Sequence, residues 1–401
     1  MTGATAVTSS REERKQRNPR PSREAQAARR LLYRVQDALR PLQRDRVQKC
    51  GRVRVGSMVA VLRSKETGKA HFGGLSTCAS VWACPVCSAI IRSRRAEEVR
   101  QAVEAHGPKR TLMLSLTVRH GLGHDLKTVR QGVAGAFRRL ARGAPWKRFV
   151  RDYGLDGSIR GLDLTHGPVN GWHPHIHALL FFDAPLTELQ LREARRWLAE
   201  RWAACVVREL GEEHRPDLEH GTDLRPCRIA EYLTKLGLEL TSPGRTKRGK
   251  GNQRTPMQIA YDFAERRDER DAELWRDYCD AMFGAKMLTW SRGLRKRLGL
   301  GEEATDEELV EEQEAAAEVV LLIEGREWDE LRDVPGGRAR VLEAAEREPA
   351  KGSSGAGPPS GEQVGRIAGF AGTKEPASSA FPASPRSIGR NGAVCGAVPS
   401  A

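Results

Sequence analysis

Two histidines and one aspartate, His175, His177 and Asp163, are the residues whose types and spacing point most directly to chemistry. The stretch 161–182 predicts two β-strands joined by the turn Gly-Pro-Val-Asn-Gly. If the turn is centred on its valine, Asp163 lies opposite His175, and Gly161 lies opposite His177. Side chains alternate across a strand, so both imidazoles and the carboxylate should share one face, with opposite Cβ atoms about 5 Å apart. Such a set leaves coordination positions open, as a catalytic Mg²⁺ or Mn²⁺ requires.

A polar strand face is the alternative explanation of a His-x-His pair, because histidine is intermediate in burial. The residues that alternate with the histidines are Pro174, Ile176, Ala178 and Leu180. These apolar residues already give the strand a buried side. The histidines are therefore not needed as core residues, which favours the metal site.

Four cysteines form a second candidate metal site. Cys84 and Cys87 make a Cys-x2-Cys knuckle, and Cys50 and Cys78 lie on either side of a predicted β-hairpin. Four thiolates in that arrangement are typical of structural Zn²⁺. A redox pair is the alternative for Cys-x2-Cys, but the βαβ context that it requires is missing from the pattern. His71 remains an alternative to Cys50 or Cys78 as a ligand.

The elements that must position these residues are a mixture of strands and helices. The pattern predicts a hairpin of strands 55–62 and 69–75, a buried strand 111–118, helices 126–142 and 187–209 on either side of the histidine hairpin, and a helix 225–240. Strand, helix, strand, strand opens a βαββαβ sheet. We therefore expect an α+β fold with a central antiparallel sheet of ferredoxin-like or RRM-like type flanked by helices, plus an N-terminal zinc-binding segment.

Several segments resemble one family of proteins. HPHIHALLFF, residues 173–182, resembles the His-hydrophobic-His motif of HUH endonucleases, and its surroundings resemble the single-tyrosine plasmid rolling-circle replication initiators (Rep proteins). CASVWACPVC (78–87), TLMLSLTV (111–118) and the Trp-Ser-x-Gly-Leu-Arg segment (290–295) are similar to further motifs of these initiators. The likeness extends over residues 75–300. It implies an HUH nuclease core that nicks and rejoins single-stranded DNA at a replication origin.

The pattern Tyr232-x-x-Lys235 resembles the nucleophile motif of these initiators. Among five tyrosines, only Tyr232 has a lysine one helical turn away in a basic context. A packing role is the alternative for any tyrosine. The resemblance implies that Tyr232 attacks the scissile phosphate and leaves a 5′-phosphotyrosine and a free 3′-OH, while Lys235 favours the phenolate.

Two departures from the family pattern concern carboxylates. The third metal ligand is commonly Glu in the family and is Asp163 here, so the ion must approach more closely. Some relatives carry a Glu four residues before the nucleophile, where this chain has Arg228. Glu239 is the candidate for the carboxylate that ends the cycle.

The charge balance predicts a polyanionic partner. The chain has 401 residues, a formal net charge of +15 and a pI of about 9.8. A basic loop is the expected phosphate contact, and its residues are Arg245, Lys247, Arg248, Lys250 and Arg254. We expect origin DNA as the partner, single-stranded or as a hairpin, with a host helicase and polymerase. No apolar run reaches the length of a membrane span or signal peptide, so we expect a cytoplasmic protein.

The predicted organisation has five parts. They are a basic N-terminal arm (1–48), the zinc-binding hairpin and helix (49–106), the endonuclease domain (107–300), an acidic helical extension (301–348) and a disordered tail (349–401). Two other functions compete with this one. A conjugative relaxase would use a tyrosine near the N-terminus, here Tyr33, and a zinc-ribbon DNA-binding regulator would use the histidines only structurally.

Overall fold

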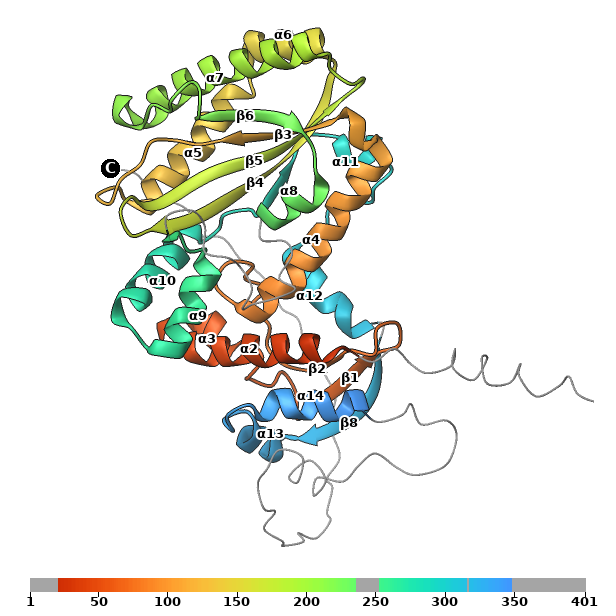
Figure 1. The fold of residues 1–401 in the computed structure, drawn as a ribbon. Helices are drawn as coiled ribbons and strands as arrows, with labels where there is room; N and C mark the ends of the chain where they lie inside the picture. The colour runs from red at the N-terminus through yellow and green to blue at the C-terminus, as the bar shows by residue number, and fades with distance from the viewer. Residues whose placement is uncertain (1–20, 236–251, 316, 348–401) are drawn as a thin grey trace, which may run out of the picture.

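The computed structural model describes residues 21–235, 252–315 and 317–347. Figure 1 shows an upper body built on a five-stranded sheet and a lower body built on a three-stranded one, with the long helix α4 (Pro85–His106) running between them. The mixed composition of helices and antiparallel strands confirms the α+β class expected from the sequence.

The five-stranded sheet has the order β6-β3-β5-β4-β7, and every neighbouring pair is antiparallel. Its strands are β3 (Thr111–Leu116), β4 (Leu155–Gly167), β5 (Gly171–Phe182), β6 (Thr222–Pro226) and β7 (Leu288–Trp290). Along the chain, α5 (Leu126–Leu140) joins β3 to β4, and α7 (Glu188–Leu210) joins β5 to β6. The predicted βαββαβ alternation is therefore confirmed, with β7 as an added edge strand.

One face of this sheet packs against α5 and α7. Both helices begin at side-chain caps: Asp125 accepts from the Thr128 amide, and Thr187 forms a capping box with Gln190. Their apolar stripes meet the even-numbered residues of β5 around Trp202. Helix α6 (Gly143–Tyr153), which the sequence pattern did not predict, lies beside them.

The other face carries the odd-numbered residues of β5 and packs against helices that come from four places in the chain. The core on this side includes Met113, Ile159, Leu179 and Tyr232. The helices nearby are α4, α8 (Ile229–Lys235), α9 (Pro256–Arg266), α10 (Glu269–Met282) and α11 (Leu294–Arg297). Short 3-10 turns at Pro108–Arg110 and Glu212–His214 complete the upper body.

The predicted helix 225–240 is wrong at its start. Arg225 and Pro226 end β6, where they pair with Met113 and Leu112, and the helix begins only at Ile229. The reason is tertiary, because the edge of β3 offers backbone partners that a local helical pattern cannot reveal. The continuation after Lys235 lies outside the described residues.

The lower body is a sheet of order β2-β1-β8, made of β1 (Met58–Ser64), β2 (Ala70–Gly73) and β8 (Ala317–Glu324). The predicted hairpin between β1 and β2 is confirmed. The acidic extension 301–348, expected to be helical, also contains the strand β8. Its run of β-branched residues and leucines pairs with β1 along its whole length. The helices of this body are α2 (Arg23–Leu39), a 3-10 turn at Arg40–Leu42, α3 (Asp45–Lys49), α12 (Asp306–Ala315), α13 (Gly325–Leu331) and α14 (Gly337–Arg347).

Ion pairs fasten the C-terminal elements to the N-terminal ones. Glu346 of α14 accepts from Arg29 of α2 at 2.5 and 2.8 Å and from the Ala70 amide of β2 at 2.9 Å. Arg52 bridges Asp37 at 2.6 Å and Asp333 at 2.8 Å. These contacts join the acidic stretch to the N-terminal elements of the lower body.

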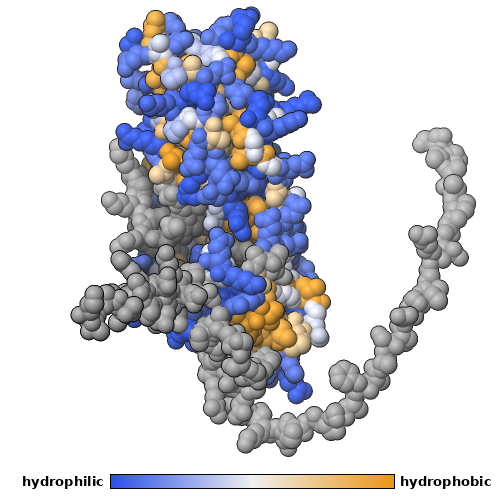
Figure 2. Space-filling model, turned by 90° about the vertical axis from the view of Figure 1, so that its right-hand side faces the viewer, coloured by the Kyte–Doolittle hydropathy of each residue, from blue (hydrophilic) through white to orange (hydrophobic). Residues whose placement is uncertain are grey.

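The surface of the upper body is largely hydrophilic, whereas an apolar patch lies lower down, at the height of β1 and β8 (Figure 2). On β1 and β8, the side chains of Met58, Val319 and Leu322 are exposed. Within the described ranges, no helix is long and apolar enough to cross a membrane.

Candidate metal centre and its surroundings

The β4–β5 hairpin places Asp163 opposite His175 and Gly161 opposite His177, so the register predicted from the turn is confirmed. Asp163 Oδ2 lies 3.0 Å from His175 Nε2 and 3.7 Å from His177 Nε2. All three candidate ligand atoms lie within 4.8 Å of one another.

Each imidazole is oriented through its other nitrogen. His175 Nδ1 donates to the carbonyl oxygen of His173 at 3.1 Å, and His177 Nδ1 lies 2.8 Å from the Ser115 hydroxyl on β3. These contacts turn both Nε2 atoms toward Asp163, as metal-binding histidines require. Sequence reasoning missed Ser115, although its place opposite His177 follows from the pairing of β3 with β5.

The electrostatics suit a cation. Burial opposes ionisation of Asp163, but the charges and hydrogen bonds of His175 and His177 outweigh it and hold the pKa of the carboxyl well below its usual range. Two nitrogen donors and one carboxylate oxygen are fewer ligands than a divalent cation usually takes, so a bound ion would keep coordination positions for solvent or a substrate oxygen. The residues present therefore fit a catalytic divalent ion such as Mg²⁺ or Mn²⁺.

Arg92 and Tyr278 also lie near this centre, and sequence reasoning did not include either of them in the site. Arg92 of α4 is buried, donates to Ser88 at 2.9 Å and lies 5.3 Å from the ring of Trp82. Burial lowers its pKa, and Tyr278 and Asp163 act in the opposite direction, so its charge lies close to both. Tyr278 is buried, with its ring stacked 6.1 Å from that of Trp172. The apolar spacing of Ala272, Trp275, Tyr278 and Met282 is the signal that could have shown this.

Further histidines extend from the metal centre. The rings of His120 and His173 are 4.2 Å apart, those of His173 and His175 are 4.8 Å apart, and those of His124 and His214 are 4.4 Å apart. Burial, with the neighbouring His175, lowers the pKa of His173 to about 3. The imidazole of His173 is therefore neutral at neutral pH, and burial lowers the pKa of its neighbour His120 as well.

Tyr232 occupies a buried position on the same face of the sheet as the histidine pair, in the core with Leu179. Its hydroxyl donates to the Ile159 carbonyl at 3.4 Å, and burial raises its pKa. Ile159 precedes Asp163 by four residues on β4, which corresponds to about 13 Å along the strand. In this position the hydroxyl does not reach the metal centre. The side chain of Lys235 and the whole of Glu239 lie outside the described residues.

The four cysteines are brought together by the loops around α3 and the start of α4. Sγ of Cys87 lies 3.4 Å from that of Cys50 and 3.8 Å from that of Cys78, and Sγ of Cys84 lies 3.7 Å from that of Cys50. All four are free thiols and form one buried candidate metal group. His71 lies on β2 and is not part of the group.

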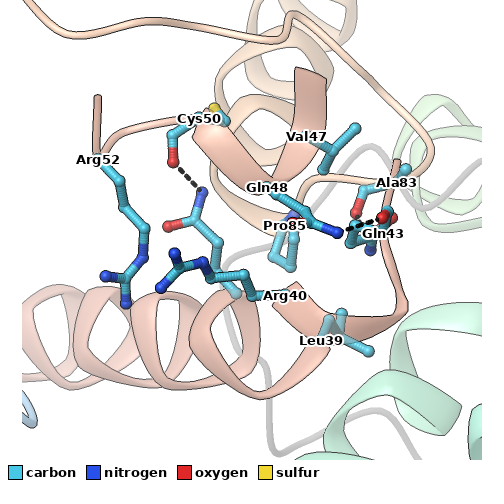
Figure 3. Close-up of a pocket in the computed structure, with 10 residues that line it drawn as sticks. Leu39, Arg40, Gln43, Val47, Gln48, Cys50, Arg52, Ala83 and Pro85 are labelled. Atoms are coloured by element: carbon cyan, nitrogen blue, oxygen red, sulfur yellow. Dashed lines mark hydrogen bonds between the residues drawn. The ribbon is translucent and has the colours of Figure 1, made fainter. Parts of the chain in front are cut away.

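A glutamine of α2 supports this cluster. Gln36 Nε2 donates to the Cys50 carbonyl at 3.4 Å and lies 3.3 Å from Cys84 Sγ. Figure 3 shows Cys50 with the side chains around it. Among these, the Gln48 side-chain amide donates to the Gln43 carbonyl at 2.7 Å. Hydrogen bonds from the other three thiols lower the pKa of Cys84, so one thiolate is already favoured.

Arg254 does not make the exposed phosphate contact expected of it. Its guanidinium is held by Asp271 at 2.7 Å and Asp262 at 2.9 Å, and its backbone pairs with His166 at the end of β4. The residue anchors α9 and α10 to the hairpin. The other residues of the basic loop, Arg245, Lys247, Arg248 and Lys250, lie outside the described residues.

The fold and the site together define an α+β domain with a candidate metal centre. Residues 74–203 match the model of the replication protein family (Rep_1).

Two curated proteins are similar to this chain. One is "Protein rep" of Streptomyces lividans, 29% identical over 298 residues; the match covers 57% of this chain and 64% of that protein. Another is the "Neomycin resistance protein" of Streptomyces cyanogenus, 32% identical over 133 residues; the match covers 27% of this chain and 30% of that one. The chain thus spans less than two thirds of the length of either relative. No solved structure matches the chain.

Proposed function

We propose that this protein initiates plasmid rolling-circle replication by nicking one strand of origin DNA and later rejoining it. The convergence of Asp163, His175 and His177 carries the proposal. The match of residues 74–203 to replication proteins supports it, because those residues include the whole of the metal centre.

The three ligands would hold Mg²⁺ or Mn²⁺, which when bound withdraws charge from the oxygens of the scissile phosphate. Ser115 and the His173 carbonyl keep the two imidazoles in the orientation that this requires. The buried charge of Arg92 lies close enough to Asp163 to attract the phosphate to the same place.

The proposed nucleophile is the hydroxyl of Tyr232. Its oxygen forms a bond to phosphorus, the bond from phosphorus to the 3′ oxygen breaks, and that oxygen takes up a proton to become the free 3′-OH. The protein–DNA ester keeps the bond energy, so rejoining needs no nucleotide cofactor. Lys235 would favour the phenolate, and Glu239 would supply the carboxylate that ends the cycle.

The reaction requires α8 to move, since Tyr232 donates to Ile159 in the described position. Exposing one large side chain costs about 1.5–3 kcal/mol. Specific DNA binding exceeds non-specific binding by about 4–10 kcal/mol, which is enough to drive this displacement. We therefore propose that DNA binding, and not the free protein, sets the reactive position of the tyrosine.

The cysteine cluster would hold a structural Zn²⁺ that ties the N-terminal elements to the start of α4. Four buried thiols within 4.8 Å support this, because closed four-thiolate sites are typical of structural zinc. The basic loop residues Arg245, Lys247, Arg248 and Lys250 would contact the origin DNA. If the protein initiates plasmid replication, its partners would include a host helicase and a polymerase, and it would act in the cytoplasm.

The relaxase alternative would require Tyr33 to attack. Tyr33 packs beside the core of the three-stranded sheet, with the guanidinium of Arg338 4.6 Å from its ring. This packing favours Tyr232, which lies on the same face as the histidines.

The deciding experiment incubates the protein with single-stranded origin DNA and Mn²⁺ and resolves the products on a denaturing gel. We expect a shifted, protease-sensitive DNA band that depends on the metal and is absent in Tyr232→Phe. A zinc-ribbon regulator would instead bind DNA without regard to Mg²⁺ or Mn²⁺ and cut no oligonucleotide, and that result would overturn the proposal.

A further inference from the structure

A hollow of about 550 Å³ lies on the outer side of the helices that cover the upper sheet, and arginine dominates its lining. Its arginines are Arg139 and Arg142 at the end of α5, and Arg201 and Arg208 on α7. Trp197 and Glu200 of α7 and Gly143 and Pro145 of α6 also line it, and the Glu200 carboxylate is paired with Arg196 at 2.9 Å.

The lining of α7 is one stripe of that helix. Trp197, Arg201, Ala204 and Arg208 are spaced by four, three and four residues, so they project from the same side. The residues on the inner side, such as Trp202, are buried against the sheet. The stripe is therefore turned away from the sheet face that carries His175 and His177.

The four arginines have different tasks. Arg201 is structural, because it donates to the carbonyls of Leu140, Arg139 and Arg142 at 2.9 to 3.2 Å and closes the end of α5. Arg139 pairs with Glu209 at 2.6 Å. Arg142 and Arg208 are exposed and form no ion pair with the part of the chain that the structure describes. They leave two positive charges directed at the hollow.

Two observations point to phosphate as the ligand. The first turn of α6 borders the hollow, and backbone amides at a helix start favour anions when arginines stand beside them. The flanking surface adds Lys147 and Arg148 of α6, both exposed, so positive charge continues beyond the hollow.

The surroundings of Trp197 favour duplex over single-stranded DNA as the ligand. A single-strand groove needs free aromatic faces on which bases stack. Trp197 is stacked against Phe149, with centroids 4.6 Å apart, and the Arg201 guanidinium lies 5.5 Å from its ring. Phe149 and Arg201 therefore restrict the access of a base to the Trp197 ring, so DNA in the hollow would be contacted through its phosphate backbone.

We propose that the hollow between α5, α6 and α7 binds the phosphate backbone of duplex DNA, on the side of the sheet opposite the metal centre. The inference rests on the proposed function in that DNA is the partner. It assigns duplex anchoring to a surface separate from the one where a single strand is cut.

The test compares Arg142→Ala/Arg208→Ala with Arg192→Ala/Arg326→Ala. The control removes two exposed arginines outside the hollow, one on α7 and one on α13, so both variants lose the same charge. Binding to a duplex origin fragment is measured by fluorescence anisotropy over a range of salt concentrations. Loss of two phosphate contacts should lower the slope of log K against log salt by about 1.8, and the control should lower it much less.

Equal slopes for the two variants would overturn the proposal. Binding of ATP or inorganic phosphate in the hollow, at concentrations that do not weaken duplex binding, would also overturn it. The hollow would then be a site for small phosphates. Cleavage of a single-stranded oligonucleotide by both variants should equal that of the wild type. If the wild type fails to cleave, the proposed nicking function fails, while the slope comparison still decides the duplex site.

Discussion

Asp163 Oδ2 lies 3.0 Å from His175 Nε2, across one pairing row of the β4–β5 hairpin. A backbone register fixes this side-chain contact, because a slip of one residue would turn Asp163 or the histidines to the opposite face. The metal centre is therefore as rigid as the hairpin that carries it.

Replacing His177 by Ala should abolish metal-dependent cleavage. A bound cation contributes several kcal/mol, so we expect a loss on the order of 100-fold or more in cleavage rate. The measurement is single-turnover cleavage of a single-stranded origin oligonucleotide with Mn²⁺, together with Mn²⁺ binding by calorimetry. His220→Ala, at an exposed histidine, is the control. Equal Mn²⁺ affinity in the two variants would refute the assignment of the ligands.

Replacing Ser115 by Ala should weaken metal binding without removing a ligand. The change deletes the hydroxyl that lies 2.8 Å from His177 Nδ1, and the loss of such a supporting contact typically costs 10–100-fold in metal affinity, as an order of magnitude. Excess Mn²⁺ should restore cleavage. Failure of high Mn²⁺ to restore it would show that Ser115 acts in some other way.

Replacing Tyr232 by Phe should eliminate the covalent DNA adduct and leave DNA binding intact. Only a hydroxyl and its bond to the Ile159 carbonyl are removed, so a change in stability of about 1 kcal/mol is expected. The matched variant is Tyr278→Phe, which alters the other buried tyrosine. Unlike Tyr232, Tyr278 is close enough for the charge of Asp163 to act on its pKa. If Tyr278→Phe loses the adduct and Tyr232→Phe keeps it, the nucleophile is Tyr278.

Purified protein should contain one zinc ion per chain, and Cys84→Ser should lose it. A closed thiolate site contributes directly to folding, so the variant should melt at a lower temperature and a chelator should reproduce the effect on the wild type. Elemental analysis and thermal unfolding are the measurements, with Cys205→Ser as a control outside the cluster. A wild type free of zinc but equally stable would contradict this expectation.

Replacing Glu346 by Gln should lower stability in a pH-dependent way. Burial opposes its ionisation, but the bonds from Arg29 and the Ala70 amide outweigh this and lower its pKa below the ordinary value of 4.5. The stabilisation is therefore present above the unfolded pKa and is lost as pH falls through the lower folded pKa. Breaking this buried pair should cost about 3 kcal/mol at pH 7, and the difference from wild type should shrink in acid.

Urea unfolding at several pH values measures this effect. Glu307→Gln, which removes an exposed partner of Arg46, should change the free energy of unfolding by at most about 1 kcal/mol. A difference between Glu346→Gln and wild type that stays constant from neutral to acid pH would contradict the ionic explanation.

Local patterns in the chain were sufficient for much of the upper body. The turn between β4 and β5 fixed the register of Asp163 and His175, and the apolar periods gave β3, α5 and α7. These elements are predictable because their hydrogen bonds and their buried faces repeat over short sequence distances. The residue type and spacing of the four cysteines likewise predicted that they lie together.

Long-range pairing decided the remainder. The sequence pattern did not predict β8, because acidic residues flank it and its partner β1 lies more than 250 residues earlier in the chain. It also did not predict β6, because the local pattern is helical and the partner of β6 is the edge of β3. The charges near Asp163 and the position of Tyr232 under Ile159 depend on how distant helices pack. The sequence by itself determined which side chains could bind a metal, since strand alternation is local. Only the tertiary structure decided which buried groups surround that candidate site and where the Tyr232 hydroxyl lies relative to it, because packing between distant elements has no local period.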